Sequence, residues 1–248
     1  MKIGMTSLTL RNESIANVVK FAKEAGIEGI EWGVSDTHMR LFDNESAEEI
    51  KDTSLKYGVE IFSLGSYCYM ETTEECDNAI ETAILLGAPV IRIWAGKKSP
   101  SDCDNDYRSK IVDNAIYMAQ QASKHNIVLG FEYHPMTLTE TCDDALALLK
   151  SINKENVGLY WQPQYNLSPE ENTRDRNRVL PYCVGNMHIQ NYAPEYGYDK
   201  LSLIEDKLNQ YFGDIKKDDY RVMIEFVKDE SIENLFDDAC VLKKVISL

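Results

Sequence analysis

Short apolar runs alternate with helical patterns eight times along the chain, and this repetition constrains the fold more than any other feature. The runs typical of buried strands cover residues 2–8, 28–33, 59–64, 89–94, 126–132, 157–161, 183–189 and 221–226. Strands that alternate with helices pair in parallel through right-handed crossovers. Strand-and-helix units at intervals of about 30 residues, without a break in composition, are typical of one closed barrel. The pattern therefore predicts an α/β fold with a single (β/α)8 TIM barrel over residues 1–248.

Helix-start signals agree with these boundaries. Two segments, Ser46-Ala-Glu-Glu49 and Thr72-Thr-Glu-Glu75, match the capping box, in which hydroxyl and carboxylate satisfy each other's unpaired backbone N–H groups. Ser168-Pro-Glu-Glu171 predicts another helix start, with proline at the first helical position, where its missing N–H costs nothing. The alternative architecture is a doubly wound open sheet, which predicts a glycine-rich phosphate loop after the first strand. The segment Thr6-Ser-Leu-Thr-Leu-Arg11 contains no glycine, so the barrel is favoured.

Charge and cysteine usage limit the partners and the compartment. The formal net charge is −15, and a surface that acidic repels a polyphosphate, so nucleic acid is not an expected partner. The six cysteines form no CxxC pair, which favours reduced thiols and a cytoplasmic protein. No apolar run reaches the roughly 18 residues of a membrane span, and the first residues lack the pattern of a secretory leader.

Polar and aromatic side chains gather at the carboxyl ends of the predicted strands, where parallel barrels place their active sites. Glu132 and His134 share one face of the fifth strand, because side chains alternate along a strand. Glu132, His188 and Glu225 each follow an apolar run in which an unpaired charge would carry a high free-energy cost. The other strand-end residues are Glu31, Trp32, Tyr67, Arg92, Trp94, Trp161, Gln162 and Gln190.

A shared divalent cation would offset that cost for Glu132, His188 and Glu225 together. With the amide oxygen of Gln162 they form an oxygen-rich ligand set that suits Mn2+ or Mg2+, while the histidine also admits Zn2+ or Co2+. The alternative is a purely structural network of buried ion pairs, in which Arg92 pairs with Glu31 or Glu132 and Glu31 only orients the arginine.

The chain resembles the xylose isomerase-like barrels of the sugar isomerase and epimerase superfamily over essentially its whole length. The matching segments are Ile30-Glu-Trp-Gly33, residues 87–96, Phe131-Glu-Tyr-His134 with residues 137–139, Met187-His-Ile-Gln190 and Met223-Ile-Glu-Phe226. The family typically holds a metal with a Glu from the middle of the barrel, an Asp after the sixth strand, a His and a final Glu. Residue by residue, Glu132, His188 and Glu225 match this pattern.

The chain departs from the metal-ligand pattern of the family after the sixth strand, in Trp161-Gln-Pro-Gln-Tyr165. Gln162 stands where the family often has the aspartate ligand, and Tyr165 stands where it has a substrate-binding histidine. A neutral amide oxygen coordinates a hard cation more weakly than a carboxylate does. The resemblance therefore implies a metal site whose fourth protein ligand is weakened.

The resemblance implies a metal-assisted isomerase or epimerase that acts on a sugar or sugar derivative by enediolate proton transfer. Glu132 and Glu225 would act as base and acid, while the metal polarises the carbonyl group. The residues expected to contact the carbohydrate substrate are Trp32, Tyr67, Arg92, Trp94, His134, Trp161 and Gln190.

Two other functions stay open on the sequence. A metal-dependent hydrolase, as in the endonuclease branch of the superfamily, needs several metals, whereas the chain has only four histidines. A noncatalytic sugar-binding barrel that lost its metal is the other alternative. The Tyr-rich segment 191–198 is expected to be a loop that acts as a lid, as a subunit contact in a homo-oligomer, or only as surface.

Overall fold

The core of the molecule is a closed parallel barrel. The computed structural model describes residues 1–215 and 220–246, in which eight strands close the barrel in the order β1-β10-β7-β6-β5-β4-β3-β2. All neighbouring strands pair in parallel. Their bounds are β1 Lys2–Thr6, β2 Gly29–Gly33, β3 Glu60–Gly65, β4 Val90–Ile93, β5 Val128–Phe131, β6 Val157–Trp161, β7 Cys183–Ile189 and β10 Arg221–Ile224. The predicted (β/α)8 barrel is confirmed.

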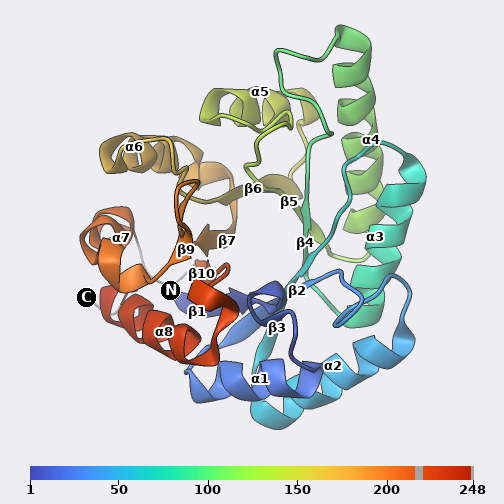
Figure 1. The fold of residues 1–248 in the computed structure, drawn as a ribbon. Coiled ribbons are helices and arrows are strands. Elements are labelled where there is room, and N and C mark those ends of the chain that lie inside the picture. Colours follow the sequence, from blue (N-terminus) through green and yellow to red (C-terminus); the bar gives the residue numbers. More distant parts are fainter. Residues whose placement is uncertain (216–219, 247–248) are drawn as a thin grey trace.

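Helices cover the outside of this barrel (Figure 1). Within the described residues they are α1 Ile15–Glu24, α2 Asn44–Tyr57, α3 Thr73–Leu86, α4 Asn105–Ser123, α5 Cys142–Ile152, α6 Pro169–Val179, α7 Glu205–Phe212 and α8 Ile232–Ile246. Across those same residues, none of the helices has both the length and the apolar character needed to cross a bilayer.

The helix starts only partly follow the predicted capping boxes. The helix start at Ser168 has a complete capping box, with Ser168 and Glu171 satisfying each other's backbone N–H groups, and Thr72 caps α3 as expected. The box predicted from Ser46 is wrong, because α2 begins three residues earlier than a cap at Ser46 implies, at Asn44. Asp43 is its cap and accepts hydrogen bonds from the backbone N–H of Glu45 and Ser46 at 3.1 and 3.2 Å. A carboxylate that accepts two such bonds displaces the nearby hydroxyl from the role.

The first strand is shorter than predicted, and the chain turns at once into the 3-10 helix η1, Ser7–Leu10. This turn joins the first strand to the last. The hydroxyl of Thr9 donates to the carbonyl of Ile224 at 3.2 Å and accepts the backbone N–H of Phe226 at 3.0 Å. The backbone that flanks Glu225 is therefore fixed by the opposite end of the chain.

The segment 191–198, predicted to be a loop, contains most of a two-stranded antiparallel hairpin. Its strands are β8 Asn191–Ala193 and β9 Gly197–Asp199, and Figure 1 shows the hairpin beside β7. The amide of Asn191 closes the base by donating to the carbonyl of Lys200 at 2.9 Å. Strands of three residues are too short to show a periodic pattern, which is why the sequence did not reveal them.

The barrel interior beneath the site is filled by large side chains. Phe62, Tyr160, Val90 and Met223 form a buried cluster there. Glycines on neighbouring strands make room for the rings: a Cβ on Gly29 would lie 2.2 Å from the Phe62 ring, and one on Gly130 would lie 2.4 Å from the Tyr160 ring. The barrel is therefore a packed core, and the polar residues sit above it.

Candidate active site

A cavity of about 850 Å³ opens at the carboxyl ends of β3, β4, β5, β6, β7 and β10. Most residues predicted to form the site line it: Tyr67, Arg92, Trp94, Glu132, His134, Gln162, Gln190 and Glu225. His188 is fully buried and contacts two of these residues, Glu132 and Glu225. The strand ends thus bring distant parts of the chain to one place.

Trp32 and Trp161 lie elsewhere. Both indoles are buried and do not line the cavity. Trp32 lies edge-on to His38. Trp161 packs edge-on against Tyr211 and Phe212 of α7. Because side chains alternate along a strand, the residues just before them, Glu31 and Tyr160, take the inward positions. The expectation that these two tryptophans contact a substrate does not hold for this cavity.

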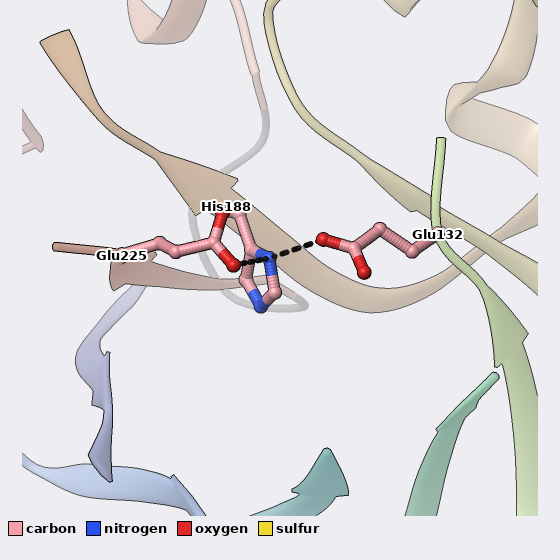
Figure 2. A group of neighbouring side chains, drawn as sticks. All are labelled: Glu132, His188 and Glu225. Carbon is pink, nitrogen blue, oxygen red and sulfur yellow. Dashed lines mark hydrogen bonds and ion pairs between the residues drawn. The ribbon is translucent and has the colours of Figure 1, made fainter. Parts of the chain in front are cut away.

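Glu132, His188 and Glu225 meet at the centre of the site. Nδ1 of His188 lies 3.2 Å from Oε1 of Glu132 and 3.4 Å from Oε1 of Glu225. Figure 2 shows the two carboxylates reaching the imidazole from opposite sides. One ligand atom from each residue lies within 4.8 Å of the others. This group is suited to hold a divalent cation through two oxygens and one nitrogen.

Glu31 orders the imidazole from its other side. Its Oε1 lies 3.3 Å from Nε2 of His188 and accepts a 2.7 Å hydrogen bond from Nε of Arg92, while Oε2 accepts the hydroxyl of Ser63 at 2.8 Å. Metal-binding histidines usually direct their second ring nitrogen to such a carboxylate. Sequence reasoning gave Glu31 no role beyond orienting Arg92, although its place after an apolar run resembled that of Glu132.

Arg92 is buried and bridges the carboxylates of Glu31 and Glu132. Its guanidinium group donates to Glu31 and, through Nη1, to Oε2 of Glu132, which also accepts the indole N–H of Trp94. Glu132 therefore receives donors from Arg92, Trp94 and His188, whereas the only partner that we find for Glu225 among the described residues is His188. The two carboxylates of the pair thus differ in how far their oxygens are already occupied.

Electrostatics keep this cluster charged despite its burial. Burial raises the pKa of Glu132, but Arg92 and His188 outweigh burial and hold that pKa below its usual range. The pKa of Glu31 is lowered in the same way, against burial, by Arg92 and His188. For His188, burial lowers the pKa, yet Glu225 and Glu31 raise it well above the ordinary value. A cation that binds at Nδ1 must therefore displace a proton.

Gln162 and Gln190 line the cavity, and each has a side-chain oxygen without a hydrogen-bond partner among the described residues. Nε2 of Gln162 donates to the carbonyl of Tyr133 at 2.6 Å, which turns Oε1 away from that bond. Within the described part of the chain, Oε1 of Gln162 and Oε1 of Gln190 are both buried without a hydrogen-bond partner. A buried acceptor of this kind normally has a partner. Each of these glutamines therefore retains an unused acceptor in the cavity wall.

Aromatic rings form two parts of the cavity wall. Trp94 packs against Tyr67 and His134, with ring centroids 5.5 and 4.6 Å away. A second group contains Tyr165, Tyr192, Tyr198 and Phe226. Sequence reasoning noted the tyrosines of segment 191–198 but did not connect them with Tyr165 or Phe226, because their proximity depends on the hairpin.

A family model described as xylose isomerase-like TIM barrel matches residues 19–199. A 3-dehydroshikimate dehydratase from Bacillus anthracis is 28% identical over 171 residues, which span 63% of this chain and 60% of that relative.

Solved structures share the fold at low sequence identity. The probable 3-DHS dehydratase involved in petrobactin synthesis in Bacillus anthracis matches with a TM-score of 0.76 and 20% identity, over 98% of this chain and 99% of the other. A D-allulose 3-epimerase from Methylomonas sp. matches with a TM-score of 0.72 and 16% identity, over 99% of this chain and 98% of the other. A xylose isomerase-like TIM barrel protein from Mycobacterium smegmatis in complex with magnesium matches with a TM-score of 0.65 and 16% identity, over 99% of this chain and 96% of the other.

Proposed function

The chain belongs to the xylose isomerase-like TIM barrel family, and from this premise we propose that it is a divalent-metal-dependent isomerase or epimerase of a sugar or sugar derivative. The observation that carries the proposal is the placement of Glu132 and Glu225 on opposite sides of His188 (Figure 2). A carbon atom between two carboxylates can lose a proton to one and regain a proton from the other. Return of a proton to the opposite face of the same carbon inverts its configuration. Return of the proton to the neighbouring carbon moves the carbonyl group.

The residues present fit a divalent ion, with Mn2+ or Mg2+ as the first candidates. Glu132, His188 and Glu225 would hold it, and the buried, unpaired Oε1 of Gln162 is the proposed fourth ligand. When bound, such an ion polarises a carbonyl group and stabilises the negative charge that develops on its oxygen.

We assign the base to Glu225, which keeps the substrate proton and can return it to the neighbouring carbon; Glu132 acts as the acid only after it has taken up a proton from solvent through the cavity. Glu132 already accepts hydrogen bonds from Arg92, Trp94 and His188, which stabilise its ionised form and make it a poor first acceptor of a substrate proton. Glu225 lines the cavity with fewer of its lone pairs engaged. Trp94, Tyr67 and His134 provide apolar ring surface for the C–H face of the sugar, and Gln190 accepts a hydroxyl hydrogen bond.

A dehydratase is the second candidate, and the specific observation that favours it is the 28% identity to a 3-dehydroshikimate dehydratase. Its first step is the same removal of a proton beside a carbonyl group. The reaction then continues by loss of a neighbouring hydroxyl as water. The two candidates therefore share the base and differ in the product.

Solvent deuterium exchange tests both candidates. The metal-loaded protein is incubated in D2O with D-allulose, D-fructose, D-tagatose and 3-dehydroshikimate, and carbon-bound protons are followed by NMR. Exchange with retention of all oxygens is expected for an isomerase or epimerase, and formation of a conjugated product for a dehydratase.

The matched variants are Glu225→Gln and Glu140→Gln. Glu140 also lines the cavity but lies outside the ion-pair cluster. Glu225→Gln is expected to slow exchange by about 10²- to 10⁴-fold, and Glu140→Gln by much less. Exchange that persists in Glu225→Gln would contradict the base assignment. A metal-free protein that binds sugars without exchanging their protons would instead support a noncatalytic barrel.

A further inference from the structure

A row of four aromatic rings crosses the wall of the cavity, starting at the residue that follows Glu225. Successive ring centroids are 5.7 Å apart from Tyr165 to Tyr192, 5.2 Å from Tyr192 to Tyr198 and 4.8 Å from Tyr198 to Phe226. We call these four residues the tyrosine ladder. All four line the cavity.

The ladder is assembled from three separate parts of the chain. Tyr165 lies in the loop after β6, Tyr192 and Tyr198 lie on the two strands of the hairpin, and Phe226 follows β10. Tyr165 is 59% exposed and Tyr198 is 36% exposed, so both rings are accessible rather than buried in the core. A contiguous exposed aromatic surface at the mouth of a cavity is typical of a binding site.

The inner end of the ladder is held in a strained conformation beside the proposed base. Phe226 has φ of +61°, which a bulky residue rarely adopts, and it directly follows Glu225. The hydroxyl of Thr9 holds its backbone by accepting the N–H at 3.0 Å. Strain that the surroundings enforce is usually found at functional positions. The ladder therefore begins one residue away from the reacting centre.

The cavity has room for more than the reacting sugar. Trp94, with Tyr67 and His134, already provides an aromatic surface next to Glu132. A volume of about 850 Å³ lies toward the upper end of the range for drug-sized ligands, whereas a single hexose is smaller than such ligands. Gln164 and Asn166 also line the cavity, close in sequence to Tyr165, and offer polar groups for hydroxyls.

We propose that the tyrosine ladder binds the second, non-reacting ring of a disaccharide or glycoside, so that the substrate is a sugar conjugate rather than a free monosaccharide. This inference rests on the proposed function for the identity of the reacting ring. The flat faces of sugar rings carry C–H groups that pack on aromatic surfaces, and the phenolic hydroxyls of the ladder add hydrogen bonds at the edges.

Calorimetric titration of the metal-loaded protein tests the inference with matched probes. D-glucose is compared with cellobiose, maltose and 4-nitrophenyl β-D-glucoside, and D-fructose with isomaltulose. At least one two-ring probe is expected to bind tenfold or more tightly than its monosaccharide. Tyr165→Ala and Tyr198→Ala are each expected to lower the affinity for that probe about tenfold, without changing the affinity for the monosaccharide.

Tyr182→Ala is the control, because Tyr182 is also exposed, at 53%, but lies before β7 and does not line the cavity. It is expected to leave both affinities unchanged. The inference is overturned if the two-ring probes bind no more tightly than their monosaccharides, or do not bind at all. It is also overturned if Tyr165→Ala and Tyr198→Ala lower the affinity for the monosaccharides and for the two-ring probes equally. A change of molar mass in Tyr198→Ala, measured by light scattering, would overturn it in favour of a subunit contact. Failure of solvent exchange would contradict the proposed function alone, because binding is measured directly.

Discussion

Nε2 of His188 lies 3.3 Å from Oε1 of Glu31, and this contact leaves Nδ1 facing the gap between the other two carboxylates. A carboxylate outside the proposed ligand group thus lies within ion-pair distance of the imidazole. The same contact supports the charge of the ring when no cation is bound.

Glu31→Gln is expected to weaken Mn2+ binding about 10- to 100-fold, the usual effect of losing the carboxylate behind a histidine ligand. Ser63→Ala serves as control, since it removes only the hydrogen bond to the other oxygen of Glu31. Calorimetric titration with Mn2+ measures both variants. Equal affinities for the two variants would show that Glu31 does not act through the histidine.

Arg92→Met is expected to lower the free energy of unfolding of the metal-free protein by about 3–5 kcal/mol, because Glu31 and Glu132 stay buried but lose the guanidinium group and keep only the imidazole of His188 as a positive partner. Added Mn2+ should stabilise this variant more than the original protein, since the ion replaces the lost positive charge. Urea unfolding with Mn2+ and with EDTA gives both values. Arg178→Met, which removes the ion pairs of an exposed arginine with Asp143 and Asp175, should lower the free energy of unfolding much less. A metal effect no larger in Arg92→Met than in the original protein would contradict a shared site.

Gln162→Asp is expected to tighten divalent-ion binding about tenfold or more, because an anionic oxygen replaces a neutral one. The variant also loses the hydrogen bond to the carbonyl of Tyr133, so a modest loss of stability, about 1 kcal/mol, should accompany the gain. Gln164→Asp adds the same charge elsewhere in the cavity wall and controls for general electrostatic attraction. If both variants bind Mn2+ equally well, Gln162 is not a ligand.

Asp238 of α8 should make stability depend on pH. Its Oδ1 accepts the backbone N–H of Leu201 at 2.8 Å, its Oδ2 has no hydrogen-bond partner among the described residues, and burial raises its pKa from 3.8 to about 6. Between these values the folded protein binds more protons than the unfolded chain, so the contribution of Asp238 to stability falls as pH rises from about 4 to about 6.

Asp238→Asn is therefore expected to gain stability relative to the original protein at pH 7.5, by about 2 kcal/mol after allowance for partial solvent screening, and little at pH 4. Urea unfolding at the two pH values measures the difference. Asp237→Asn removes the neighbouring carboxylate, which is exposed and pairs with Lys200, and should show a smaller trend, because its charge is only a secondary cause of the raised pKa of Asp238. A gain that is the same at both pH values would refute this role for Asp238.

Much of the barrel could be predicted because the alternation of strands and helices is strong and local. The bounds of β6 and β7 agree with the predicted ranges 157–161 and 183–189. Glu132, His188 and Glu225 were recognisable because each ends an apolar run, where a charge without a partner is costly.

Other features depended on information that the sequence pattern does not contain. The direction of a side chain changes with a shift of one residue, so Trp32 and Trp161 could not be distinguished from inward-facing neighbours such as Glu31. The hairpin at Asn191–Asp199 has strands too short for periodicity. The tyrosine ladder could not be predicted without it, because its rings meet only once that hairpin is folded.

The pairing of the first strand with the last has a consequence for synthesis of the protein. Glu225 follows β10, which joins β1 on one side and β7 on the other, and Thr9 fastens the backbone just beyond it. While the ribosome is still making the earlier units, neither edge of the barrel has its partner and the cluster around His188 lacks one carboxylate. The candidate site is therefore complete only once β10 has been made and has paired with both β1 and β7.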